Sequence, residues 1–167
     1  MTTKILSDET GKHEIVITRI FDASPERVFQ AWTDPKLMAQ WWGPKNSTTP
    51  VVNIDLRVGG EYLYCMRSAD GQDTWGKGIY KEIVKPFRIV VTDSFADPQG
   101  NTVPASYYGV QEDMPLEMLV TLTFEEQSGG TKFTLIHSGL PHGQMSDLTK
   151  AGWNESFDKL AELFKNG

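Results

Sequence analysis

The chain has 167 residues, which is enough for one domain with a single hydrophobic core and too few for two full domains. Hydrophobic residues make up 39% and charged residues 23% of the sequence, which excludes disordered, collagen-like and coiled-coil classes. The 22 acidic and 16 basic residues give a formal charge of -6, so the electrostatic attraction that drives binding to nucleic-acid phosphates is missing. We therefore expect a folded acidic domain that binds no nucleic acid.

The N-terminal region and the cysteine content indicate the compartment. No run of 18 apolar residues occurs, and residues 1–14 contain no apolar stretch that would mark an export signal. Cys65 is the single cysteine, so neither an internal disulfide nor a thiolate metal cluster can form. We expect a cytoplasmic protein without a membrane span, with an N-terminal tail over residues 1–13 and a single domain over residues 14–167.

The first part of the domain predicts one strand followed by two short helices. Residues 14–21 place apolar and β-branched side chains on both faces of an extended segment, which is typical of a strand. A Ser-Pro pair at residues 24–25 and an Asp-Pro pair at residues 34–35 each offer an N-cap followed by proline at the first helical position. A Gly-Pro pair at residues 43–44 stops the second helix, which we expect over residues 35–42.

Antiparallel strands are expected through the middle of the chain. Gly-Gly, Asp-Gly and Lys-Pro pairs separate strand-like runs, and no helical pattern lies between them. The six expected strands cover residues 51–57, 61–67, 75–84, 88–95, 117–125 and 131–137. The segment 96–115 holds three prolines, two glycines and two adjacent tyrosines, and it is longer than most unstructured connections. Such a loop is often a lid over a site.

Residues 146–164 have the pattern of a long amphipathic helix. Charged residues fall on one half of the helical wheel. The other half carries Leu148, Trp153, Phe157, Leu160, Leu163 and Phe164. At ~1.5 Å per residue, such a helix can cross a whole sheet. We therefore expect an α+β fold in which a seven-stranded antiparallel sheet curls around the C-terminal helix.

Small residues in the apolar stripe of this helix leave room between the helix and the sheet. Thr149, Gly152 and Ser156 lie at the centre of the stripe, and the bulky side chains lie at its flanks. Two interpretations stay open. Either large side chains of the sheet fill the room and complete the core, or an apolar cavity runs there, as in most ligand sites.

Strand alternation would place a few polar groups against the same room. Tyr62, Tyr64 and Met66 share one face of their strand, where the two hydroxyls need partners or a ligand unless the tyrosines are half exposed. His137 shares the inner face of the last strand with apolar residues. A lone histidine in an apolar wall is more often a structural hydrogen-bonding residue than a catalyst, and no second titratable residue can be placed beside it.

Motifs for metal, phosphate and hydrolytic chemistry are missing from the sequence. H-E-x-x-H, G-x-S-x-G and the glycine-rich phosphate-binding motifs do not occur. His137 and His142 stand five residues apart, which matches no usual zinc-ligand spacing. Adjacent carboxylates such as Glu125 and Glu126 lie next to turns, where a solvated surface role is common. We assign no catalytic pair, no metal and no cofactor.

Short motifs follow one another from about residue 14 to residue 164. They are Ser-Pro-Glu-Arg-Val-Phe at 24–29, Ala-Trp-Thr at 31–33, Trp-Trp-Gly-Pro at 41–44, Val-Gly-Gly at 58–60, Met-Arg at 66–67, Asp-Gly at 70–71, Tyr80 with Glu-Ile-Val at 82–84, and Gly-Trp at 152–153. In content and order they resemble the bacterial activator-of-Hsp90-ATPase homologue family of the START-like, or SRPBCC, helix-grip superfamily. The segment 96–115 is an insertion relative to the shortest family pattern.

The resemblance implies a helix-grip fold with a deep apolar cavity under the C-terminal helix. It leaves three functions in competition, of which we favour binding of a small hydrophobic molecule. The others are a partner role with Hsp90 or another protein, linked to stress response, and a cyclase or hydrolase that uses His137 or a tyrosine as acid or base. For the favoured function we expect ligand-binding residues at Trp42, Tyr62, Tyr64, Met66, Trp75, Phe95, Tyr107, Met118, Val120, His137, Thr149, Gly152, Trp153 and Ser156.

Overall fold

The computed structural model describes residues 12–111 and 113–165. Most of the expected tail, residues 1–11, lies outside the described residues. The elements in chain order are β1 (Lys12–Phe21), α2 (Pro25–Thr33), α3 (Pro35–Trp41), β2 (Thr48–Ile54), β3 (Glu61–Arg67), β4 (Asp73–Val84), β5 (Arg88–Ala96), β6 (Thr102–Val103), the 3-10 helix η1 (Ala105–Tyr108), β7 (Met118–Gln127), β8 (Gly130–Pro141) and α4 (Gln144–Lys165). None of these helices is long and apolar enough to cross a membrane.

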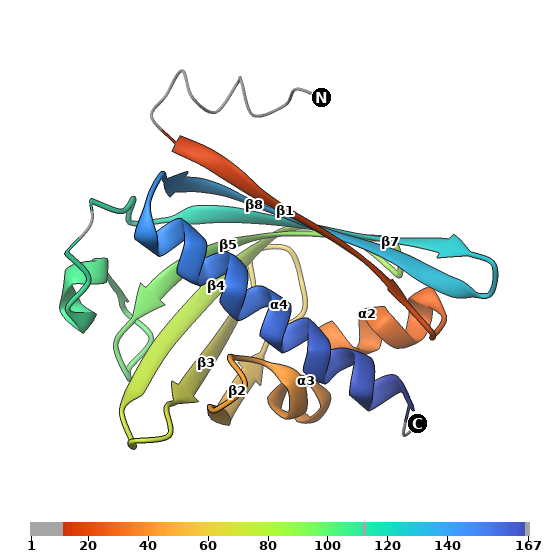
Figure 1. Ribbon diagram of the computed structural model, residues 1–167, viewed down its shortest axis with the longest axis horizontal. Helices are drawn as coiled ribbons and strands as arrows, with labels where there is room; N and C mark the ends of the chain where they lie inside the picture. The colour runs from red at the N-terminus through yellow and green to blue at the C-terminus, as the bar shows by residue number, and fades with distance from the viewer. Residues whose placement is uncertain (1–11, 112, 166–167) are drawn as a thin grey trace.

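The strands form one antiparallel sheet in the order β1-β8-β7-β5-β4-β3-β2, and β6 pairs with β5 off this path. Leu135 of β8, for example, lies between Ile17 of β1 and Leu122 of β7. The sheet curves behind α4, which crosses it diagonally, and α2 and α3 lie beside the C-terminal half of α4 (Figure 1). The expected α+β fold is confirmed, and the two-residue strand β6 is added to the seven expected strands.

Both short helices begin at the proline that the sequence indicates, because a side chain caps each start. Ser24 Oγ accepts a hydrogen bond from the amide of Arg27 at 3.3 Å. Asp34 Oδ1 accepts one from the amide of Lys36 at 2.9 Å. The helices are then joined by the Trp41 indole, which donates a 2.9 Å hydrogen bond to a backbone carbonyl of α2. This contact fixes the position of α3, from which one wall of the site begins.

Aromatic rings from α2, the sheet and the C-terminal half of α4 form the core. Phe157 and Leu160 are fully buried. The ring of Phe157 lies edge-on to Phe133, with 5.2 Å between centroids, and Trp32 stacks on Phe133 at 5.7 Å. Such ring pairs stabilise the fold beyond the area that they bury. Leu148, expected on the buried half of the same helix, is instead 56% exposed, because it lies at the mouth of a pocket.

The segment expected to form a long unstructured loop is partly ordered. Val103 of β6 pairs with Phe95 of β5. The hydroxyl of Tyr108 in η1 donates to the carbonyl of Ala96 at 2.5 Å and accepts from the amide of Trp75 at 3.1 Å. The segment therefore folds back onto β4 and β5. Strand β6 could not be predicted from the sequence, because two residues are too few to show the alternation of a strand.

Candidate functional site

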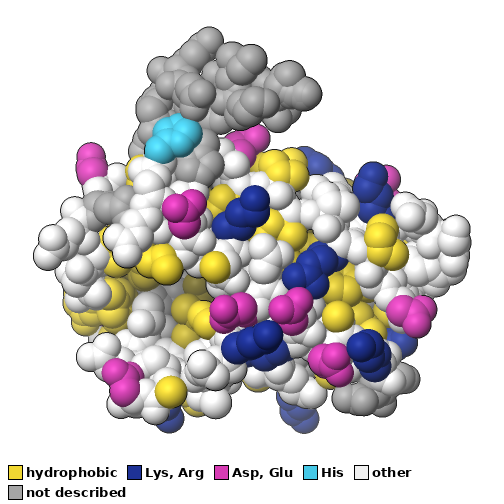
Figure 2. Space-filling model, viewed as in Figure 1, with side chains coloured by type: hydrophobic (Ala, Val, Ile, Leu, Met, Phe, Trp, Pro, Cys, Tyr) yellow, Lys and Arg dark blue, Asp and Glu magenta, His cyan; other side chains and the backbone are white. Residues whose placement is uncertain are grey.

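A pocket of about 240 Å³ lies between the N-terminal half of α4 and the inner face of the sheet. Figure 2 shows it as a hollow surrounded by hydrophobic side chains. Ten of the fourteen expected ligand-binding residues line it: Trp42, Tyr64, Met66, Phe95, Met118, His137, Thr149, Gly152, Trp153 and Ser156. Strand and helix periodicity thus brings most of the expected residues together. Ligand binding by them stays a prediction.

The other four expected residues do not line the pocket. Tyr62 and Val120 are buried in the core, and Tyr62 stacks against the pocket residue Tyr64 with 5.9 Å between ring centroids. Trp75 lies next to the folded-back segment, where its amide meets Tyr108. Tyr107 is 55% exposed. Tyr62 and Val120 share a face with the pocket but lie too far along their strands. Trp75 lies on the opposite face of the sheet, because its neighbour Gly76 faces Tyr64.

Seven lining residues were missed by the sequence reasoning: Gly43, Pro44, Asp93, Ser94, Met114, Met145 and Leu148. Two of them had a usable signal. Alternation along β5 puts Asp93 on the face of Phe95, and Met145 precedes Thr149 by one helical turn. Met114 had none, because it lies in the segment without a period. It is the only residue of the described part of 96–115 that lines the pocket.

Small side chains on α4 create the room on the helix side. A Cβ atom at Gly152 would meet only the ring of Pro44, at 3.9 Å, so the space over this glycine is open. The hydroxyls beside it are tied to the backbone, since Thr149 Oγ1 donates to the carbonyl of Met145 at 2.7 Å and Ser156 Oγ to that of Gly43 at 2.9 Å. The helix therefore offers a small and mostly apolar surface to the pocket.

On the sheet side, two glycines of β4 let the tyrosine rings of β3 lie flat. A Cβ atom at Gly76 would lie 2.3 Å from the hydroxyl oxygen of Tyr64, and one at Gly78 would lie 2.6 Å from the ring of Tyr62. Burial raises the pKa of both tyrosines well above the usual range, and the negative charge of Asp93 raises each pKa further. Both hydroxyls are therefore neutral.

His137 holds a defined tautomer at the pocket wall. The indole nitrogen of Trp153 donates a 3.0 Å hydrogen bond to Nδ1 of His137. Because an indole N–H can only donate, Nδ1 is an acceptor and the proton of the neutral imidazole lies on Nε2. Asp93 Oδ2 lies 3.3 Å from Nε2 but off the direction of its N–H bond, so Nε2 has no hydrogen-bond partner among the described residues. The pocket wall thus holds a buried donor beside a carboxylate.

The neighbour of His137 corrects an expectation from the sequence, which placed no titratable residue beside it. Asp93 of β5 pairs with Met118 of β7, and His137 of β8 pairs with Val120 of the same strand. The two side chains meet by reaching across β7. Only the order of the strands in the sheet reveals this contact, because the two residues are far apart in the chain.

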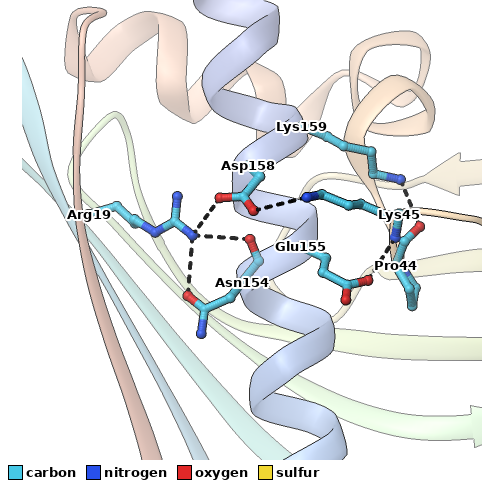
Figure 3. A network of polar contacts seen from close by, with 7 residues as sticks. All are labelled: Arg19, Pro44, Lys45, Asn154, Glu155, Asp158 and Lys159. Carbon is cyan, nitrogen blue, oxygen red and sulfur yellow. Dashed lines mark hydrogen bonds and ion pairs between the residues drawn. The ribbon is translucent and has the colours of Figure 1, made fainter.

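The loop after α3 forms the rim of the pocket and is fixed to α4. Lys159 Nζ donates to the carbonyl of Pro44 at 3.1 Å, and the amide of Lys45 donates to Glu155 Oε1 at 2.9 Å (Figure 3). Burial lowers the pKa of Lys159, whose ammonium group is partly withdrawn from water. Together with the bond from Ser156, these contacts hold the loop against the helix.

The opposite side of α4 is fixed to β1 by one arginine. Arg19 Nη2 lies 3.0 Å from both the carbonyl oxygen of Asn154 and Oδ1 of Asp158. Asp158 also faces Lys45, with 3.8 Å between Oδ2 and Nζ. The helix is therefore held between the first strand and the rim loop. The pocket opens beside a helix whose position is set by both.

Comparison with known protein families identifies the family of this chain. The family model described as "Activator of Hsp90 ATPase homolog 1-like protein" matches residues 22–165. The chain belongs to this family, hereafter AHSA1. The resemblance seen in the sequence is therefore confirmed. No curated protein matches the chain.

Solved structures of bacterial proteins have the same fold. Protein CV1439 from Chromobacterium violaceum is 30% identical, with a TM-score of 0.75 over 90% of this chain and 95% of that one. Protein Ms6760 from Mycobacterium smegmatis is 26% identical, with a TM-score of 0.73 over 90% and 89%. The AHSA1 protein from Silicibacter pomeroyi is 25% identical, with a TM-score of 0.72 over 92% and 99%. The chain thus spans nearly the whole length of these relatives.

Proposed function

We propose that this AHSA1-family protein binds a small hydrophobic molecule in the pocket under α4. The observation that carries the proposal is an apolar pocket of about 240 Å³ between the helix and the sheet, with open space over Gly152. An apolar cavity of ~150 Å³ is enough to bind benzene. The pocket therefore has room for a substituted aromatic ring or a short apolar chain.

The composition of the pocket wall supports the proposal. Four of the six methionines in the chain line it: Met66, Met114, Met118 and Met145. Methionine side chains are flexible and polarisable, so they adapt to ligands of different shape. A wall of this kind suits reversible binding better than it suits the fixed packing of a core.

The tautomer of His137 weakens the enzymatic alternative. Its Nε2 carries the proton of the neutral imidazole and is a hydrogen-bond donor, whereas a general base needs a free lone pair. Moving the proton to Nδ1 would set it against the indole N–H of Trp153. His137 is thus better suited to orient a ligand than to take a proton from it.

The matched family motivates one other candidate, a partner role with Hsp90. Titration of purified Hsp90 with the protein in a calorimeter tests it directly. Saturable heat that survives filling of the pocket would support this role independently of ligand binding.

Titration with n-propylbenzene tests the proposed function, with the indole N–H signals in NMR spectra as the readout. Trp42 and Trp153 line the pocket, so their signals should shift in a saturable way. Gly152→Leu should abolish these shifts, because the added side chain fills the open space while the fold survives at a cost of ~1 to 3 kcal/mol.

Ala151→Leu is the matched control, because Ala151 is next to Gly152 in the chain but is exposed to solvent. It adds the same side chain outside the pocket and should leave the shifts intact. Native mass spectrometry of freshly purified protein should in addition show a retained small molecule. Unchanged propylbenzene shifts in folded Gly152→Leu would refute the proposed function.

A further inference from the structure

The pocket carries one carboxylate and no matching cation. Asp93 is the only acidic residue in its lining, and the lining contains no Lys or Arg among the described residues. The side chain of Asp93 is 17% exposed, and its ion-pair distance is to His137, whose neutral form supplies a donor rather than a full charge. A carboxylate that is largely withdrawn from water is costly unless an opposite charge meets it.

The buried donor of His137 lies beside this carboxylate without a hydrogen bond to it. Nε2 of His137 lacks an aligned acceptor among the described residues and lies 3.3 Å from Asp93 Oδ2. The Trp153 hydrogen bond fixes the imidazole, so the N–H cannot turn toward the carboxylate. Asp93 therefore receives no hydrogen bond from His137, and its charge acts on the pocket: the pKa of Tyr64 is raised by burial first and by the charge of Asp93 second.

The remaining wall suits a cation as well as an apolar body. Four aromatic residues line the pocket: Trp42, Tyr64, Phe95 and Trp153. The face of an aromatic ring attracts an ammonium group, most strongly where water is excluded. A carboxylate ligand would be repelled, because it would face the like charge of Asp93 without a cation to offset that charge.

We infer that the pocket selects small ligands whose apolar body carries a protonated amine, and that it rejects ligands with a carboxylate head. Asp93 would accept a hydrogen bond from the ammonium group, and the aromatic wall would surround the body. The inference deepens the proposed ligand-binding function and rests on it. In this inference Asp93 is the residue that determines whether the pocket accepts a ligand with a positive or a negative head group.

Three probes with one phenylethyl body test the inference at neutral pH. They are 2-phenylethylamine, n-propylbenzene and 3-phenylpropanoate, which differ only in a cationic, apolar or anionic head. We expect the amine to bind the wild type at least about ten-fold more tightly than the carboxylate, a difference of about 1.4 kcal/mol. In Asp93→Asn the dissociation constants of the amine and the carboxylate should agree within about two-fold.

Asp147→Asn is the charge-matched control, because Asp147 is exposed in the first turn of α4 and does not line the pocket. It should keep the wild-type preference. The inference is wrong if the carboxylate binds the wild type as well as the amine does, a comparison that needs no variant, or if Asp93→Asn keeps the preference. Binding of propylbenzene without charge selection would overturn only the inference, whereas no binding of any probe would overturn the proposed function too.

Discussion

The two halves of α4 face the same sheet with opposite results. In the C-terminal half, Phe157, Leu160 and Phe164 are buried and fill the space down to the strands. In the N-terminal half, Thr149 and Gly152 leave a pocket. Both halves carry charged residues on their outer face, so amphipathic patterning alone does not distinguish a core from a cavity. Side-chain volume along the inner stripe makes that difference.

The pocket end of β8 also carries a buried imidazole beside a carboxylate. Phe133 and Leu135 lie at the packed end and are fully buried among apolar side chains. His137, two residues further on, lies at the pocket end with Asp93 and the tyrosines nearby. The imidazole and the carboxylate therefore lie where the interior is incompletely filled, which is where a ligand would meet them.

The largest expected effect belongs to the packed end. Phe157→Ala should lower the free energy of unfolding by ~3 to 5 kcal/mol, because it removes a fully buried ring that contacts several others. Urea denaturation measures the change. Leu148→Ala is the control at the pocket mouth and should cost less than ~0.5 kcal/mol, since that side chain is already exposed. Equal losses in the two variants would erase the contrast between the halves.

An intermediate effect should appear at alkaline pH and should map to the pocket end. The raised pKa values of Tyr62 and Tyr64 keep their hydroxyls neutral in the folded protein, whereas both ionise near pH 10 when it is unfolded. Their contribution to stability is therefore complete below pH 10 and is lost as the pH rises above it.

The double variant Tyr62→Phe/Tyr64→Phe measures this loss. Between pH 9 and pH 11 the wild type should lose about 2 to 3 kcal/mol more than the double variant, since each tyrosine contributes about 1.4 kcal/mol per pH unit. Urea denaturation at each pH gives both curves. Parallel curves would mean that the two hydroxyls ionise as freely in the folded state as in the unfolded one.

The smallest effect has the opposite sign. Gly152→Ala should stabilise the protein by ~0.5 to 1 kcal/mol, because alanine favours a helix interior over glycine and its Cβ meets only Pro44 at ordinary contact distance. Thermal denaturation detects the shift. A destabilised Gly152→Ala variant would show that the space over this glycine is closed. The two halves of the helix would then not differ in how completely they fill the space above the sheet.

Local signals predict most of this fold, because its elements begin and end at strong turn and cap residues. The strand over residues 61–67 matches β3, and the caps at Ser24 and Asp34 match the starts of α2 and α3. The segment 96–115 resisted prediction, because its two-residue strand and its 3-10 turn are set by contacts with β4 and β5. Tertiary contacts of this kind leave no period in the sequence.

The pocket was predictable to the extent that it depends on faces. Periodicity identifies the faces that carry Gly152 and His137, but not how far along a strand the packing ends, so Tyr62 and Val120 were expected at the site and lie in the core. Asp93 was not predicted beside His137 for another reason. Its contact with His137 crosses β7, and only the strand order of the whole sheet predicts it.

The pairing of β1 with β8 has a consequence for how the protein is made. During synthesis β1 is complete after residue 21, yet its partner strand ends at residue 141 and the helix that covers it ends at residue 165. The hydrogen bonds from Arg19 to Asn154 and Asp158 can likewise form only after α4 has been synthesised. The first strand must remain unpaired while more than a hundred residues leave the ribosome, so the domain closes in a late step and exposes its aromatic interior until then.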